Sequence, residues 1–166
     1  TNPYIPSTLE TLPGGAVFEI NTAAQGMVGE MTTRIVGEGG AALIIDYGYV
    51  EGSNVDTLQA VKEHAYHNVL QAPGDADITA HVDFSAISMA ALDGGAQIYG
   101  PVGQGNFLRS LGIRERAQQL SANASERQAA DIGSALNRLT APDSMGDLFK
   151  VMALTSSGGP MPPGFE

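Results

Sequence analysis

The stretch "ALIIDYG", residues 42–48, gives the strongest indication of the fold. Its apolar residues run up to Asp46 without alternating with polar ones, which is typical of a central strand covered on both faces. In open α/β sheets, ligands bind beyond the carboxyl ends of such strands. We therefore expect the residues from Asp46 to Tyr49 to lie near a functional site.

Further strands and helices alternate around this segment. The residue pattern predicts strands at 16–20, 77–82, 96–102 and 148–155. It predicts helices at 22–37, 55–64 and 125–140, and the last of these opens with the Ser125/Gln128 spacing of a capping box. Strands that alternate with helices predict an α/β fold.

Composition narrows the classes of function. The 166 residues, 43% of them hydrophobic, are enough for one domain with its own core. A net charge of −10, from 18 acidic and 8 basic residues, argues against a nucleic-acid partner. The chain has no cysteine, which excludes disulfides, thiolate metal sites and a cysteine nucleophile. No apolar stretch is long enough to cross a membrane.

The segment "DITAHVDF", residues 77–84, carries the most candidate chemistry. Read as a strand, it places Asp77, Thr79, His81 and Asp83 on one face. That face is compatible with a reaction centre, a metal site or an ordinary solvated surface. However, "DFSAISMAALDGG" is typical of a helix with Asp83 as its N-cap, which would remove Asp83 from the face.

Other motifs are less specific. "HAYH", residues 64–67, spaces two imidazoles at i and i+3, and with His81 it raises the hypothesis of a small metal-dependent hydrolase. The segment lacks a following acidic ligand, so histidines at a helix C-terminus are the favoured interpretation. "GPVGQG", residues 100–105, does not have the spacing of a nucleotide-binding loop, and Pro101 removes an amide donor.

Charge is unevenly distributed along the chain. Residues 46–93 contain eight acidic residues against the single base Lys62. This bias suits a cleft that receives a cation, such as a guanidinium held by carboxylates, and it equally suits a solvated acidic surface. Arg109, Arg114 and Arg116 form a small basic patch, which we interpret as a feature of helix pairing.

Five segments in order resemble the C-terminal half of the MidA family. They are "GGAALIIDYGY" (39–49), "DTLQAVKEH" (56–64), "PGDADITAHVDF" (73–84), "GPVGQGNFLRSLGI" (100–113) and "MGDLFKVMALT" (145–155). The members are S-adenosylmethionine-dependent methyltransferases, and the mitochondrial ones assist assembly of respiratory complex I. The resemblance spans nearly the whole chain.

The resemblance implies part of a class I methyltransferase fold, a doubly wound Rossmann-like sheet with an antiparallel closing strand pair. It implies methylation of protein arginine. Asp46, His81 and Asp83 become candidate catalytic residues. Candidate substrate-binding residues, matched through the family's motifs, are Tyr47, Gly48, Asp77, Thr79 and Gln104.

The resemblance also implies that the chain is a partial domain. The family's glycine-rich S-adenosylmethionine loop belongs to its N-terminal half and is not found in these residues. We therefore expect residues 1–155 to be the C-terminal part of a methyltransferase domain, inactive by itself, followed by a flexible Gly/Pro-rich tail at 156–166. The expected compartment is the cytoplasm for a bacterial protein and the mitochondrial matrix for a eukaryotic one. The alternative is a non-catalytic acidic module that binds a basic protein.

Overall fold

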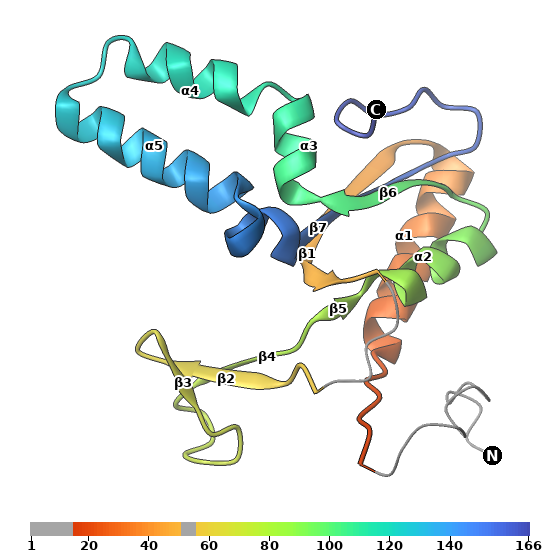
Figure 1. The fold of residues 1–166 in the computed structure, drawn as a ribbon. Helices are drawn as coiled ribbons and strands as arrows, with labels where there is room; N and C mark the ends of the chain where they lie inside the picture. Colours follow the sequence, from red (N-terminus) through yellow and green to blue (C-terminus); the bar gives the residue numbers. More distant parts are fainter. Residues whose placement is uncertain (1–14, 51–55) are drawn as a thin grey trace.

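The computed structural model describes residues 15–50 and 56–166, which contain two β-sheets and five α-helices (Figure 1). The larger sheet has the strand order β5-β1-β7-β6, with β1 at Ala41–Tyr49, β5 at Val82–Asp83, β6 at Gln97–Gly103 and β7 at Phe149–Thr155. β5 is parallel to β1, and β7 is antiparallel to both β1 and β6. The mixed α/β class is confirmed, as are the predicted strands at 42–48, 96–102 and 148–155.

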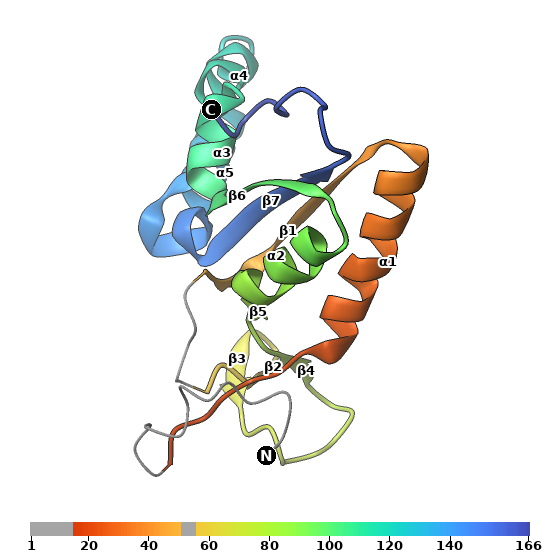
Figure 2. The ribbon, with the colours of Figure 1, turned by 90° about the vertical axis from the view of Figure 1, so that its right-hand side faces the viewer.

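Two helices cover one face of this sheet, α1 (Thr22–Glu38) and α2 (Phe84–Asp93) (Figure 2). Both begin at a capping side chain: Asn21 Oδ1 accepts a hydrogen bond from Ala24 N–H at 2.9 Å, and Asp83 caps α2. The core lies beneath them and is formed by Val28, Ile35, Phe84, Ile87, Met152 and Leu154. Burial of side chains of this size stabilises the fold by about 1.5–3 kcal/mol each. The predicted helix at 22–37 is confirmed.

The opposite face of β1 differs from our expectation. Leu43 and Ile45 point away from the helices and are 52% and 46% exposed. The prediction that β1 is covered on both faces is therefore wrong for the described residues. The apolar run comes from a strand with apolar residues on both faces, of which the face with Leu43 and Ile45 has no covering layer among the described residues.

One edge of β1 is also open. β1 pairs with β7 from Ala41 to Tyr47, whereas its other edge pairs with β5 only at Gly48 and Tyr49. Over 41–47, no strand in the described part of the chain bonds to that second edge. The backbone groups of this edge are available to a further strand.

The smaller sheet has the order β3-β2-β4, with β2 at Gln59–Lys62, β3 at Ala65–His67 and β4 at Asp77–Thr79. The helix predicted at 55–64 is therefore wrong for residues 56–64. Residue 55 lies outside the described residues. Glu63 and His64 both have positive φ and form a tight turn between β2 and β3. β2 pairs with β3 along one edge and with β4 along the other, and this tertiary pairing prevails over the helical spacing of Leu58 and Val61.

Two more predictions need correction. The strand expected at 77–82 is divided: β4 ends at Thr79 in the small sheet, and β5 begins at Val82 in the large one. Residues 80 and 81 link the two sheets. The segment 16–20, expected as a strand, has no regular structure and leads into α1.

The remaining helices form an arm at one end of the large sheet. α3 (Gln104–Ser110) leads into the antiparallel pair α4 (Ile113–Ser121) and α5 (Glu126–Thr140), which projects from the body (Figure 1). The Ser125/Gln128 capping box is present, so the predicted helix at 125–140 and its start are confirmed. A π-helical turn, η2 (Pro142–Gly146), connects α5 to the region before β7. No helix in the described ranges has the length and apolar character to span a bilayer.

The Gly/Pro-rich tail has packing partners at its end. The ring of Phe165 lies 5.2 Å from that of Phe107 on α3 and 6.4 Å from that of Tyr99 on β6. Gly164 is buried against Phe107. The expected mobility of 156–166 stays a prediction, whereas the position of Phe165 is defined by two aromatic contacts.

Gly48 is the position where β5 approaches β1 most closely. A Cβ at residue 48 would lie 2.2 Å from the Val82 carbonyl oxygen and 3.0 Å from the Phe84 ring. We expect Gly48→Ala to lower the free energy of unfolding, measured by urea denaturation, by about 1–3 kcal/mol or more. Gly133→Ala is the matched control, because residue 133 lies in α5 with nothing near its Cβ position, and it should stabilise the protein by about 0.5–1 kcal/mol. Equal effects of the two changes would contradict this account.

Candidate functional site

An open cleft of about 720 Å³ lies where the two sheets meet. The large-sheet side contributes Tyr47 and Tyr49 at the end of β1, together with Leu148 before β7. The small-sheet side and its connections contribute Asp56, Thr57, Leu58, Gln59, Val61, Tyr66, Thr79 and His81. The cleft therefore lies beyond the carboxyl end of the 42–48 strand, where the sequence predicts a functional site.

Aromatic rings orient His81 in this cleft. The rings of Tyr47 and His81 are 5.7 Å apart and inclined at 60°, an edge-to-face contact. Tyr47 also packs against Phe149, its partner across the β1/β7 pair, at 5.5 Å and 88°. Tyr47 is thus held between a strand neighbour and His81, which fixes one wall of the cleft.

A carboxylate that sequence reasoning missed lies beside the cleft. Glu19 accepts hydrogen bonds from Thr57 N–H at 2.8 Å and from Thr57 Oγ1 at 2.5 Å. Thr57 Oγ1 in turn accepts a hydrogen bond from His81 N–H at 2.9 Å. No short-range spacing links residues so far apart in sequence, and the segment of Glu19 was expected to be a strand.

Tyr49 lies in the most perturbed electrostatic environment of the cleft. Burial raises the pKa of its phenol above the ordinary value of 10.0, and the negative charges of Asp83 and Glu19 raise it further. The phenol therefore stays protonated over a wider pH range than an exposed tyrosine and remains a hydrogen-bond donor.

The structure brings together only some of the predicted site residues. Tyr47, Thr79 and His81 line the cleft. Asp46 belongs to the same face of β1 as Ile44, towards the helices, and its Oδ1 accepts a hydrogen bond from Tyr47 N–H at 2.8 Å. Asp77 begins β4 and is exposed outside the cleft lining.

Gly48 and Gln104 have structural contacts where we expected substrate contacts. Gly48 is buried against β5 and Phe84, where a side chain would not fit. Gln104 starts α3, and its Nε2 donates to the Leu139 carbonyl near the end of α5 at 2.9 Å. Gln104 is not part of the cleft lining.

Asp83 is the N-cap of α2, as the sequence predicts. Its Oδ1 accepts hydrogen bonds from Ser85 N–H at 2.9 Å and Ala86 N–H at 3.1 Å. The Ser85 hydroxyl donates to the same oxygen at 2.5 Å. The cap places the charge of Asp83 next to Tyr49, its register partner across β1 and β5.

The acidic residues of 46–93 do not form a single cluster. Asp56 lines the cleft, and Asp75 pairs with Lys62 at 3.1 Å in an exposed salt bridge. Glu51 lies outside the described residues. The described cleft lining contains no Lys or Arg, and the preference of this cleft for a cation stays a prediction.

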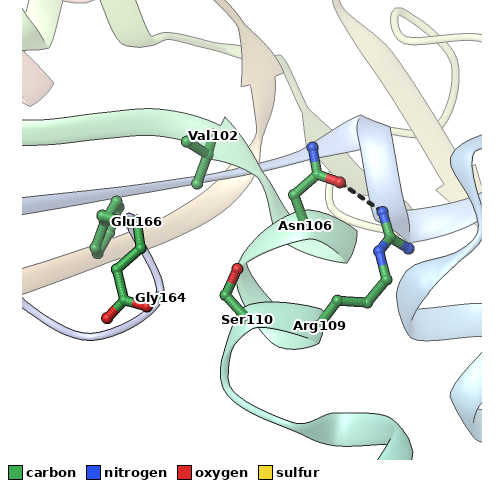
Figure 3. Close-up of a pocket in the computed structure, with 7 residues that line it drawn as sticks. Val102, Asn106, Arg109, Ser110, Gly164 and Glu166 are labelled. Carbon is green, nitrogen blue, oxygen red and sulfur yellow. Dashed lines mark hydrogen bonds between the residues drawn. The ribbon is translucent and has the colours of Figure 1, made fainter.

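A second, smaller pocket of about 390 Å³ lies beside α3 (Figure 3). Arg109 borders it and donates hydrogen bonds to Asn106 Oδ1 at 2.6 Å and to the Thr140 carbonyl at 2.9 Å. The bond to Thr140 ties α3 to the end of α5, which confirms Arg109 as a helix-pairing residue.

The remaining motifs have structural explanations. His64 lies in the β2/β3 turn and His67 at the end of β3, so the expected helix C-terminus is wrong. The described ranges contain no group of three or more His, Asp or Glu placed to hold a metal ion. In "GPVGQG", the Cβ positions of Gly103 and Gly105 face backbone atoms of Gly146 and Thr140 at 3.0 and 2.5 Å. These glycines permit close packing and do not form an open cradle for a cofactor.

A comparison with family models identifies the chain. Residues 1–102 match the family described as "Putative S-adenosyl-L-methionine-dependent methyltransferase". The chain belongs to this family, the MidA family. The resemblance seen in the sequence is thereby confirmed, and the family depends on S-adenosylmethionine.

Curated relatives and solved structures agree with this membership. The MidA-family chain is 38% identical over 153 residues to the mitochondrial protein arginine methyltransferase NDUFAF7 homolog of Drosophila melanogaster, covering 90% of this chain and 35% of that protein. It is 41% identical over 129 residues to mitochondrial NDUFAF7 of Mus musculus, covering 77% and 29%. A likely methyl transferase from Burkholderia thailandensis, crystallised with S-adenosyl-homocysteine, superposes with a TM-score of 0.75 at 30% identity, covering 96% and 41%. The chain spans about a third of the length of these curated relatives.

The capping role of Asp83 predicts a difference between two substitutions. Asp83→Ala removes the acceptor of the α2 N-terminus and should lower the free energy of unfolding by about 1 kcal/mol, whereas Asp83→Asn keeps an acceptor and should cost clearly less. Urea denaturation of both variants measures the difference. An equal loss in the two variants would show that the charge of Asp83, and not its cap, stabilises the fold.

The environment of Tyr49 predicts a late titration step. A phenol whose pKa is raised on folding contributes stability that is complete below about pH 10 and is lost as the pH rises through the folded-state pKa. In an ultraviolet titration of phenolate, the step lost in Tyr49→Phe identifies this tyrosine, and Glu19→Gln should move that step to lower pH. The control is Glu38→Gln, at the exposed end of α1, which should leave it in place. A step unmoved by Glu19→Gln would mean that Glu19 does not act on Tyr49.

Proposed function

We propose that this chain supplies the substrate side of an S-adenosylmethionine-dependent methyltransferase that acts on arginine in proteins. The observation that carries the proposal is the cleft at the end of β1, whose described lining includes three tyrosines, a histidine and a carboxylate and has no Lys or Arg. The names of the relatives in fly and mouse support arginine as the target. In this proposal the four strands of the large sheet are part of a doubly wound class I methyltransferase sheet.

The lining suits a guanidinium. The faces of Tyr47, Tyr66 and His81 can contact a planar cation, and Asp56 adds a negative charge at the cleft wall. A guanidinium has a very high pKa, so its nitrogen becomes nucleophilic only when neighbouring groups localise its charge and accept its protons. We assign the acceptance of a hydrogen bond or proton from the attacking nitrogen to the imidazole of His81, which lines the cleft in contact with Tyr47.

The described residues do not fit the cofactor by themselves. All three glycines of the segment at 100–105 are packed against backbone atoms, so no step of the reaction is assigned to a cofactor held there. When bound by the whole protein, S-adenosylmethionine supplies the methyl group. The part played by this chain is to bind and orient the acceptor, because displacement at a sulfonium methyl requires an aligned nucleophile.

The compartment and partners follow from the same proposal. The partner is a protein with an accessible arginine. The site of action is the mitochondrial matrix if the chain is eukaryotic, as for the relatives named mitochondrial, and the cytoplasm if it is bacterial.

The test is methyl incorporation from labelled S-adenosylmethionine by the full-length protein. We expect His81→Ala to lower the rate at least about 100-fold, the usual contribution of a general base. His67→Ala is the control, because His67 lies on β3 outside the cleft lining. Normal rates in both variants would remove His81 from the site. A full-length protein that neither binds the cofactor nor transfers methyl groups would favour the non-catalytic acidic module instead.

A further inference from the structure

The cleft is assembled from chain segments that are far apart in sequence. Glu19 precedes α1, Thr57 precedes β2, and His81 lies in the link between β4 and β5. At residues 80 and 81 the chain belongs to neither sheet, so no strand pairing holds the main chain of His81. The position of the His81 main chain, and with it that of the imidazole, therefore depends on another interaction.

A directed chain of hydrogen bonds meets this need. The Thr57 hydroxyl has one proton, and it donates that proton to the Glu19 carboxylate at 2.5 Å. Its lone pairs are then free to accept the His81 N–H at 2.9 Å. Thr57 N–H adds a second bond to Glu19 at 2.8 Å, so the carboxylate binds both donors of one residue. Hydrogen bonds to an ionised acceptor are stronger than neutral ones, which makes Glu19 the anchor of this chain.

We propose that Glu19 is a positioning residue: acting through Thr57, it fixes the main chain of His81 and thereby the place of the imidazole against Tyr47. The inference rests on the proposed function of the cleft. It goes beyond that function because it assigns a role to a side chain outside the cleft lining, in a segment that contributes to no sheet.

If the Glu19–Thr57 hydrogen bonds only stabilised the fold, their loss would have a different measurable effect. It would lower the stability of the whole fold without a selective effect on His81 or on the acceptor. Loss of a positioning residue affects His81 alone. The His81 amide then exchanges faster and kcat/KM for the protein acceptor falls, whereas the Kd for S-adenosylmethionine does not change.

The first experiment compares Thr57→Val with Thr57→Ser in the full-length protein. The valine side chain has nearly the shape of threonine but neither donates to Glu19 nor accepts from His81, whereas serine retains the hydroxyl. The main-chain N–H of residue 57 still donates to Glu19 in both variants. Amide hydrogen exchange should show the His81 N–H at least about tenfold faster in Thr57→Val and nearly unchanged in Thr57→Ser. An unchanged His81 amide in Thr57→Val overturns the proposal, whatever the protein catalyses.

The second experiment measures steady-state methyl transfer by Glu19→Gln, with Glu30→Gln as the control. Glu30 lies exposed on α1, so the two variants lose the same charge. We expect kcat/KM for the protein acceptor to fall by about 10- to 100-fold in Glu19→Gln, the usual cost of a misplaced reacting group, with an unchanged Kd for S-adenosylmethionine. Thr57→Ser should retain most of the activity. Equal activity of the two glutamine variants, or a loss matched by a lower melting temperature and weaker cofactor binding, overturns the positioning role.

If the full-length protein transfers no methyl group at all, the proposed function fails, and the exchange experiment still decides whether Glu19 and Thr57 position His81. The two proposals are therefore tested separately.

Discussion

The close approach of β5 to Gly48 is the contact on which the arrangement of the cleft depends. The Val82 carbonyl and the Phe84 ring both occupy space that any side chain at residue 48 would fill. Phe84 is fully buried and begins α2, so this one approach joins the sheet to the helical layer. It also sets the position of Asp83, which pairs with Tyr49 and caps the helix. In "DITAHVDF" the roles of Asp83 and Phe84 are thus decided by where Val82 meets β1, and Asp77 and Thr79 are placed by the pairing of β4 with β2.

Sequence patterns predicted the elements whose signals are long and locally complete. The apolar runs of β1 and β7 and the capping box at Ser125 needed no information from elsewhere in the chain. The prediction of a helix at 55–64 is wrong because the spacing of Leu58 and Val61 also fits a helix. The tight turn at Glu63 and His64 requires positive φ at both residues, which neither residue type indicates. The strand predicted at 77–82 is too long. Polar and apolar residues continue to alternate through residues 80 and 81, where the chain passes from the small sheet to the large one.

The candidate site shows the same limit in another form. The family resemblance predicts Tyr47 and His81 at one site, and the structure places their rings in contact. Asp46 was expected with them, but adjacent residues of a strand point to opposite faces, and Asp46 faces the helices. Glu19 was not expected because its partner Thr57 is selected by the tertiary fold and by no spacing in the sequence.

The open edge of β1 has a practical consequence for handling the protein. β1 has nine residues with exposed Leu43 and Ile45, and most of one edge has no strand partner among residues 15–50 and 56–166. Such an edge is a template for pairing between molecules. The described part of this edge carries no proline or lysine to discourage such pairing. Self-association through β1, leading to aggregates rich in intermolecular sheet, is therefore the characteristic hazard of this chain in isolation, and it would be relieved by anything that occupies that edge.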